Sequence, residues 1–187
     1  MPRIFKPLKK TEGIDCFIEN FEDNYKDYHS SGLQNLYKAE GKHFWFKSRR
    51  ELIIKYFHKY LKLNSSIIEI GAGTAYVAQG LLNSGYDVSV GEIHLSGLKF
   101  AQEKGIKNCY QFDLFSPPFE DEFDAIGLFD VIEHLDDDVR AINEVTTMLK
   151  PGGKIFITVP AHQWLWSRID AVANHKRRYS IKSLLNS

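Results

Sequence analysis

Between residues 67 and 159, short runs of β-branched and aromatic residues alternate with stretches of helical periodicity. This alternation, with its short connections, is typical of a parallel sheet that carries helices on both faces. Because parallel crossovers are right-handed, the doubly wound arrangement is the expected topology. The pattern therefore predicts an α/β fold built on a doubly wound, mainly parallel sheet.

The bounds of the expected elements can be read from the same pattern. The predicted strands cover Ile67–Ile70, Tyr86–Val90, Lys107–Phe112, Phe123–Phe129 and Lys154–Val159. The predicted helices cover residues 48–61, 76–82, 98–104 and 137–149. Ser48 and Glu51 have the spacing of a capping box, so we expect the first helix to begin at Ser48. Ser180 is the expected N-cap of a further helix through Leu184 and Leu185.

These elements predict a folded domain over residues 48–187, preceded by an N-terminal extension or lid over residues 1–47. Residues 1–35 are polar and irregular and predict no strand. Five strands are readable, and the fifth would lie at an edge of the sheet. Since exposed edges invite pairing, we expect either a shortened chain or a second copy that covers this edge.

Gly71 and Gly73 directly follow the first predicted strand. In open parallel sheets, ligands bind outside the carboxyl ends of the strands, near the point where the strand order reverses. Glycines there let the backbone turn sharply and approach a ligand where a Cβ would collide. The pattern indicates a ligand-binding loop, and a tight turn without a ligand is the alternative.

Acidic residues mark the ends of the next three predicted strands. Glu92 ends the second strand, where a carboxylate can accept hydrogen bonds from both hydroxyls of a ribose. Asp113 follows the third strand, where it can meet the exocyclic amine of a purine. Asp130, next to Phe129, ends the fourth strand on the other side of the same crevice. Each acid alone is compatible with a solvated loop residue, but together they favour a nucleoside ligand.

The residue at position 76 separates two classes of nucleoside ligand. A dinucleotide fingerprint has the form G-x-G-x-x-G/A, whose last small residue lets the helix pack closely beneath a pyrophosphate. Counted from Gly71, that position holds Tyr76, whose phenol ring fits poorly. No Gly-Lys-Ser/Thr follows, which also disfavours a P-loop. S-adenosylmethionine has no phosphate, so the spacing favours this methyl donor.

The segment Glu69-Ile70-Gly71-Ala72-Gly73-Thr74-Ala75 matches the motif E/D-x-G-x-G-x-G, except that Ala75 replaces the last glycine. Two further segments match the same family, Asp130–Leu135 after the fourth strand and Leu149–Gly153 before the fifth. Residues 69–160 therefore resemble the class I S-adenosylmethionine-dependent methyltransferases, in the broad group of the ubiquinone/menaquinone-type enzymes. His43–Phe46 and Arg49 resemble the N-terminal approach of some bacterial members.

The resemblance implies a Rossmann-like fold, S-adenosylmethionine as the cofactor and methyl transfer as the activity. Family members normally continue with a helix and two more strands, so this chain is expected to lack the last strands of the family's sheet. The expected cofactor-binding residues are Glu69, Gly71, Ala72, Gly73, Glu92, Ile93, Asp113, Leu114, Phe129 and Asp130.

Methyl transfer to a hydroxyl needs positioning and a general base. His134 is the candidate base, because the loop after the fourth strand should aim it toward the crevice; the alternative is that Glu133 and His134 cap or orient the next helix. On the acceptor side we expect His162 and Trp166, which suit a flat or apolar substrate. Arg177 and Arg178 could bind a phosphate or carboxylate of the acceptor. The alternative for His162 and Trp166 is that they pack a surface helix. The alternative for Arg177 and Arg178 is that they belong to a solvated basic face.

No metal site is expected, because the seven histidines are scattered and no H-E-x-x-H motif occurs. The formal net charge of zero does not favour a nucleic-acid partner. The chain shows neither a signal peptide nor an apolar stretch long enough to insert into a membrane. The two cysteines are too few for a disulfide framework. We therefore expect a cytoplasmic enzyme acting on a small molecule, with a non-catalytic cofactor-binding or scaffold protein as the alternative.

Overall fold

The computed structural model describes residues 3–19 and 30–186 and contains a seven-stranded sheet. The strand order is β2-β3-β6-β5-β4-β8-β9, and every pairing except that of β2 with β3 is parallel. A separate antiparallel pair joins β1 (Arg3–Ile4) to β7 (Phe119–Glu120). The strands of the main sheet are β2 (Lys9–Thr11), β3 (Ile14–Cys16), β4 (Ser66–Ile70), β5 (Asp87–Glu92), β6 (Asn108–Gln111), β8 (Phe123–Phe129) and β9 (Leu149–Thr158).

The five strands expected from the sequence are confirmed, and they form the centre of this sheet. In chain order they are β4, β5, β6, β8 and β9, and in space they run third, second, first, fourth, fifth. The chain therefore reverses its winding direction at β4, after which β8 pairs with the other side of that strand. This reversal creates a crevice at the carboxyl ends of β4 and β8, where doubly wound folds bind their ligands.

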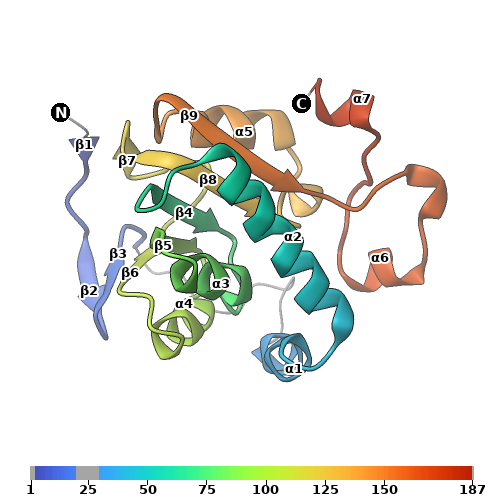
Figure 1. Cartoon of the computed structure of the whole chain (residues 1–187), viewed down its shortest axis with the longest axis horizontal. Coiled ribbons are helices and arrows are strands. Elements are labelled where there is room, and N and C mark those ends of the chain that lie inside the picture. Colours follow the sequence, from blue (N-terminus) through green and yellow to red (C-terminus); the bar gives the residue numbers. More distant parts are fainter. Residues whose placement is uncertain (1–2, 20–29, 187) are drawn as a thin grey trace.

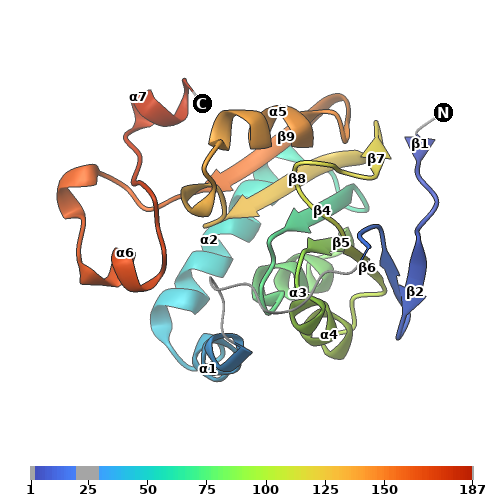
Figure 2. The ribbon, with the colours of Figure 1, turned by 180° about the vertical axis from the view of Figure 1, so that it is seen from behind.

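Helices cover both faces of the sheet, as the alternating pattern predicts. Figure 1 shows α2 crossing one face beside α3 and α4, while α5 covers the opposite face, which Figure 2 brings to the front. The longer helices are α1 (Ser30–Glu40), α2 (Phe44–Tyr60), α3 (Tyr76–Asn83), α4 (Leu95–Glu103) and α5 (Asp138–Thr146). The short ones are η1 (Ile132–His134), η2 (Gln163–Leu165), α6 (Arg168–Val172) and α7 (Ile181–Leu184).

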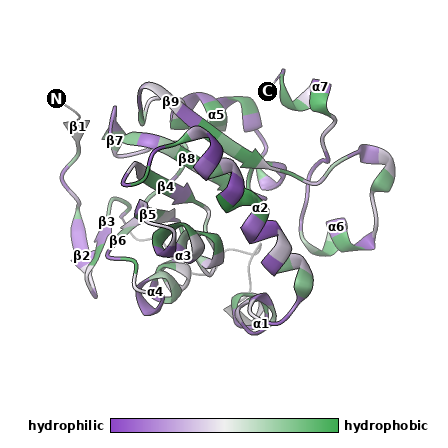
Figure 3. Ribbon diagram, in the orientation of Figure 1, coloured by the Kyte–Doolittle hydropathy of each residue, from purple (hydrophilic) through white to green (hydrophobic). Residues whose placement is uncertain are grey.

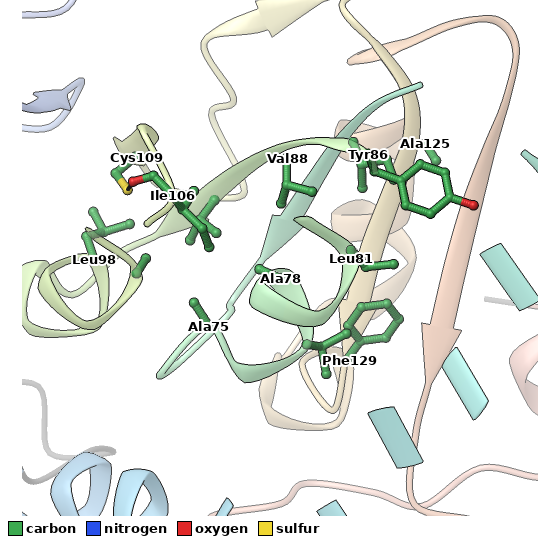
Figure 4. Close-up of a cluster of buried hydrophobic side chains, with 14 of the residues drawn as sticks. Ala75, Ala78, Leu81, Tyr86, Val88, Leu98, Ile106, Cys109, Ala125 and Phe129 are labelled. Atoms are coloured by element: carbon green, nitrogen blue, oxygen red, sulfur yellow. Dashed lines mark hydrogen bonds between the residues drawn. The ribbon is translucent and has the colours of Figure 1, made fainter. Parts of the chain in front are cut away.

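Alternation along the strands divides the buried residues between two cores. In β4, Ile67 packs into the core beneath α2, α3 and α4, and Ile68 packs into the core beneath α5. Figure 4 shows the first core, in which Ala78 and Leu81 of α3 lie against side chains of the strands. Both cores hold the carboxyl ends of β4 and β8 in fixed register, which fixes the crevice as well.

The expectation of an irregular N-terminus is wrong for the residues that the structure describes; residues 20–29 lie outside them. β3 pairs in parallel with β6, and β2 returns along β3, so the N-terminal segment adds two strands to the sheet. Ile14 and Cys16 of β3 are fully buried. Because these strands have only three residues each, their alternation is too short to be recognised as a pattern.

The capping box predicted at Ser48 and Glu51 is also wrong, because α2 begins one turn earlier, at Phe44. The imidazole of His43 takes the N-cap role by accepting a hydrogen bond from the Trp45 amide. Histidine is an uncommon cap, so the Ser/Thr rule misses this start. The helix consequently runs across the boundary expected between residues 47 and 48.

Only some of the apolar side chains of α2 are buried. Ile53 and Phe57 face the core, whereas Leu52 and Tyr56 are about half exposed. In Figure 3, α2 correspondingly carries both hydrophobic and hydrophilic residues on its visible side.

The bounds of two other helices also differ from those expected. α4 begins at Leu95, and α5 ends at Thr146, because Leu149 already pairs with Phe123 as the first residue of β9.

β9 lies at an edge of the sheet, as expected, and no strand follows it in the described chain up to residue 186. Just beyond its end, Ala161 forms a parallel bridge with Tyr179. The expected cap at Ser180 is confirmed, since its hydroxyl accepts a hydrogen bond from the Ser183 amide. Within the described residues, the helices are all too short or too polar to cross a bilayer.

Candidate functional site

The loop after β4 has left-handed backbone at three of its positions. Gly71 has φ +69°, Gly73 has φ +54° and Ala75 has φ +58°. A Cβ on residue 71 would lie 2.7 Å from Cγ2 of Val131, so glycine is needed there for the loops after β4 and β8 to approach each other. A Cβ on residue 73 would meet only Leu33, at 3.8 Å. The loop thus exposes its backbone to the crevice.

Glu92 binds this loop to the end of β5. Its Oε2 accepts a hydrogen bond from the Gly73 amide at 3.2 Å, and its Oε1 accepts from the Ile93 amide at 2.8 Å. Oε1 also accepts from the His94 amide at 3.2 Å. The carboxylate is buried but lines a cavity, and its two oxygens together can accept about four hydrogen bonds. Glu92 therefore holds the loop and still offers acceptor capacity to a ligand.

Two cavities adjoin at the carboxyl ends of the strands. The first, of about 700 Å³, lies between α1, the start of α2, the loop after β4 and α6. The second, of about 560 Å³, lies between the ends of β5, β6 and β8. Gly71, Gly73, Asp130 and His134 line both cavities, so the two spaces meet at the glycine loop.

The structure brings all ten expected cofactor-binding residues to these cavities. The first cavity is lined by Glu69, Gly71, Ala72, Gly73, Phe129 and Asp130. The second is lined by Gly71, Gly73, Glu92, Ile93, Asp113, Leu114 and Asp130. Asp113 keeps only part of its carboxylate available, because its Oδ1 accepts a hydrogen bond from the Phe115 amide at 2.9 Å.

Glu69 is buried at the end of β4, and its Oε2 has no hydrogen-bond partner among the described residues. Burial raises the pKa of this carboxyl from 4.5 to about 8, although the nearby guanidinium of Arg49 opposes the shift. A buried carboxyl oxygen without a hydrogen-bond partner is costly. Because Glu69 lines the first cavity, a cationic or hydrogen-donating ligand there would satisfy it.

Arg49 of α2 connects the N-terminal part of the chain to the ends of β8 and β9. Its Nη2 lies 2.7 Å from Oδ2 of Asp130 and donates to Oγ1 of Thr158 at 2.9 Å. Its guanidinium also lies 5.3 Å from the ring centre of Trp45. The sequence indicates Arg49 only through its resemblance to some family members; its partner Asp130 could not be paired with it without the fold.

A second polar cluster closes the first cavity on the side of α1. Glu40, at the end of α1, accepts a hydrogen bond from the hydroxyl of Thr74, and Lys104 donates to the Thr74 carbonyl at 2.6 Å. Burial lowers the pKa of Lys104, while Glu40 opposes that shift. The sequence does not indicate this cluster, because its members lie 30 and 34 residues apart along the chain.

His134, the expected general base, lies at the junction of the two cavities. It is the last residue of η1, and its ring packs edge-on against His175, with 4.9 Å between ring centres. The neighbouring Glu133 is fully buried, and burial followed by repulsion from Asp130 raises the pKa of its carboxyl to about 8. The histidines are scattered in the sequence, yet the fold brings two of them and a carboxyl together.

The four residues expected to bind the acceptor lie outside the residues that line the two cavities. His162 and Trp166 are exposed on the segment around η2. Arg177 lies 2.8 Å from Asp138, and Arg178 lies 2.7 Å from Asp170, so both guanidinium groups hold the chain in place. The residues after β9 that do line the first cavity are Ile169, Val172, Ala173, Asn174 and His175.

The strand order and the glycine loop define a Rossmann-like α/β protein with a ligand site at the reversal point. Residues 68–157 match the family model described as "Methyltransferase domain". A ubiquinone biosynthesis O-methyltransferase of Xylella fastidiosa (strain M23) is 22% identical over 152 residues, which cover 77% of this chain and 62% of that protein. The chain thus spans less than two thirds of the length of this relative.

Solved structures share the fold at low sequence identity. Haemonchus contortus phosphoethanolamine N-methyltransferase 2, in complex with phosphomonomethylethanolamine and S-adenosylhomocysteine, has a TM-score of 0.70 at 20% identity, over 90% of this chain and 43% of that chain. The [4+2]-cyclase SpnF has a TM-score of 0.57 at 20% identity, over 65% and 49%. The domain match, the relatives and the shared fold together support a class I S-adenosylmethionine-dependent methyltransferase domain over residues 68–157.

Proposed function

We propose that this protein binds S-adenosylmethionine in the two adjoining cavities and transfers its methyl group to a small-molecule acceptor. The observation that carries the proposal is the buried carboxyl of Glu69, whose Oε2 has no hydrogen-bond partner among the described residues and which lines the first cavity together with Gly71 and Gly73. An amino-acid ammonium group is a fitting partner for such a carboxyl. The relatives named as O-methyltransferases support the same reaction class.

The residues of the site fit the parts of the proposed cofactor. Glu92 would accept hydrogen bonds from the ribose hydroxyls, and Asp113 with Leu114 would border the adenine in the second cavity. Glu69 and the backbone of Gly71–Gly73 would hold the methionine part. When bound, the cofactor supplies an electrophilic methyl group, so the chain itself has to orient the acceptor and exclude water.

The acceptor is expected in the first cavity, where aromatic and aliphatic side chains surround a few polar groups. Trp45, Phe46, Ile169 and Val172 form its apolar lining. Such a lining suits a flat, largely apolar molecule. We assign the activation of an acceptor hydroxyl to His134, because this residue borders both cavities. His162, Trp166, Arg177 and Arg178 would reach an acceptor only if their segment moved toward the cavity.

Isothermal calorimetry with S-adenosylmethionine, S-adenosylhomocysteine and NAD tests the cofactor assignment. We expect both methionine-derived ligands to bind and NAD to give no saturable heat, since Tyr76 occupies the position that a dinucleotide loop needs for a small residue. Glu92→Ala should weaken cofactor binding by about 1–3 kcal/mol, the cost of leaving buried partners unpaired. Asp87→Ala, at the exposed start of the same strand, is the matched control. Binding of NAD alone would refute the proposal.

Turnover separates an enzyme from a scaffold. A catalytic protein should release S-adenosylhomocysteine when mixed small-molecule extract is added, and Glu92→Ala should reduce the rate in proportion to its loss of affinity. Cofactor binding that persists while extracts from several sources give no product would favour the non-catalytic alternative.

The same proposal places the protein in the cytoplasm, where the free thiols of Cys16 and Cys109 would stay reduced. A second copy covering the β9 edge stays a prediction, which the mass in solution would test.

A further inference from the structure

Three potential metal ligands lie close together beside the first cavity. One ligand atom from each of Glu133, His134 and His175 lies within 4.8 Å of the others. The first two residues belong to η1, whereas His175 lies about 40 positions later in the chain, after α6. His134 and His175 both line the cavity, so the cluster borders the space assigned to the acceptor.

Glu133 is the anionic member of the cluster. Its side chain is fully buried, and neither carboxylate oxygen has a hydrogen-bond partner among the described residues. Most buried side-chain oxygens in folded proteins are hydrogen-bonded, and an unpartnered one indicates a missing group. Arg49, whose charge acts on the Glu133 carboxyl, is already paired with Asp130 and Thr158. A cation at the cluster would give Glu133 the partner that the chain itself does not supply.

Asp170 holds the ring of His175 from one side. The Nδ1 of His175 lies 2.9 Å from Oδ1 of Asp170, so Nε2 is the nitrogen that would bind a metal ion. A carboxylate behind the imidazole fixes the ring and increases the basicity of the other nitrogen. Asp170 is itself held by Arg178, whose Nε and Nη2 donate to it at 2.7 and 2.8 Å. The carboxylate therefore has a defined position without any ion.

The segment that carries His175 is also attached directly to η1. The Lys176 amide donates to the Glu133 carbonyl at 2.8 Å. Arg177 donates to the carbonyls of Leu135 and Asp136 at 3.0 and 2.9 Å. These bonds use the backbone and leave the Glu133 side chain unengaged. The three ligands are consequently brought together by the fold itself, as a preorganised site requires.

We propose that Glu133, His134 and His175 bind a divalent transition-metal ion of the Zn²⁺ or Co²⁺ type. Two imidazoles and one carboxylate suit these ions, whereas Mg²⁺ prefers oxygen ligands only. Three protein ligands leave coordination positions open toward the cavity. The expectation of no metal site rested on scattered histidines, and the fold removes that argument by pairing His134 with His175.

The role of the ion rests on the proposed methyltransferase function. An acceptor hydroxyl would bind the ion through its oxygen and release its proton to water, since a metal ion lowers the pKa of a bound O–H group. The oxygen then forms a bond to the methyl carbon as the carbon–sulfur bond breaks and leaves its electron pair on sulfur. His134 activates the hydroxyl as a metal ligand, which replaces the general-base role expected from the sequence. The inferred acceptor class is a hydroxyl compound with an apolar body.

Calorimetry of tag-free protein, stripped with EDTA and dialysed, tests the site with ZnCl₂ and MgCl₂. We expect one Zn²⁺ per chain and at least tenfold weaker binding of Mg²⁺. Glu133→Gln and His175→Ala should each weaken Zn²⁺ binding by about 10–100-fold. His58→Gln, which removes an exposed imidazole elsewhere, should leave the affinity unchanged. Circular dichroism confirms that each variant is folded, and Glu133→Gln keeps the shape of the side chain. Equal Zn²⁺ affinity in all variants, or no saturable binding, would overturn the site.

Asp170 is a positioning residue, and Asp170→Asn tests that role. We expect weaker Zn²⁺ binding with unchanged stoichiometry, while S-adenosylmethionine affinity stays at the wild-type value. If both affinities fell together, Asp170 would be a structural residue only.

Measuring both ligands on the same samples separates this proposal from the previous one. Zn²⁺ binding without S-adenosylmethionine binding would refute the methyltransferase assignment and retain the metal site. S-adenosylmethionine binding without Zn²⁺ binding would refute the metal site and retain the methyltransferase assignment. Turnover that survives EDTA at the full rate would refute the role of the ion in the reaction.

Discussion

Ala75 adopts a backbone conformation that normally favours glycine. Its φ of +58° lies in the left-handed region, at the position where the family motif has its last glycine. The methyl side chain is fully buried in the core beneath α3, which offsets part of the backbone cost. The departure from the motif therefore changes the side chain but keeps the shape of the loop.

Substitutions at position 75 should reveal this balance. Ala75→Gly should change the free energy of unfolding by no more than about 1 kcal/mol, because relief of strain and loss of burial oppose each other. Ala75→Val should destabilise by about 2–4 kcal/mol, since a branched side chain fits neither the left-handed backbone nor the full core. Urea denaturation measures both. A harmless valine would show that the loop does not hold this conformation.

Glu69 should make stability depend on pH. Its carboxyl faces Arg49, Glu40 and Lys104, and its pKa of about 8 in the folded protein exceeds the ordinary 4.5. Between these values the folded state retains a proton that the unfolded state releases, so stability should fall as pH rises from 5 to 8. The slope from one such group reaches about 1.4 kcal/mol per pH unit.

The variant Glu69→Gln removes this titration and should flatten the profile relative to the wild type. Denaturation in urea at pH 5, 6.5 and 8 provides the measurement. Parallel profiles for the two proteins would show that Glu69 ionises normally.

The sequence was most informative about single residues. Acids at strand ends were correctly located, because the parallel arrangement alone brings strand ends together.

Elements were predicted less well where they were short or atypically capped. β2 and β3 were missed because three residues show no usable period, and the early start of α2 was missed because a histidine caps it. The five central strands were found because each has a buried run next to a helical stretch. Their register and the pairing of β3 with β6 depend on contacts that no local pattern contains.

β3 should contribute measurably to the stability of the whole sheet. Ile14 is fully buried in the core that lies beneath α2, α3 and α4, so Ile14→Ala should destabilise the protein by about 2–5 kcal/mol. Lys9→Ala, on the exposed neighbouring strand, should have little effect. Thermal and urea unfolding test the pair. Equal stability of both variants would mean that the N-terminal strands do not belong to the cooperative fold.

At the scale of the molecule, the site is assembled from segments that are distant in the chain. α1 and the start of α2 line the first cavity from the N-terminal side, and α6 lines it from the C-terminal side. The sequence indicated the cofactor half of the site, whose residues follow successive strands. The acceptor half depends on where the segments before β4 and after β9 fold back, which side-chain patterns do not specify.

Ligand binding should therefore stabilise the entire fold. A ligand at 100 times its Kd adds about 2.7 kcal/mol, which should raise Tm by about 5–10 °C in a chain of this size. Thermal unfolding with S-adenosylhomocysteine should show this rise, with a smaller rise for Glu92→Ala at the same concentration. NAD is the negative control. Stabilisation by NAD instead would contradict the proposed cofactor.

The raised pKa of the buried Glu69 carboxyl also links ligand binding to proton release. At neutral pH the ligand-free protein would hold a proton on this group, and a cationic ligand favours the ionised form. Occupation of the cavity should then expel that proton. The apparent affinity would tighten as pH rises toward 8, and the measured binding enthalpy would change with the ionisation enthalpy of the buffer. Cofactor uptake in this protein would thus respond to the acidity of its surroundings.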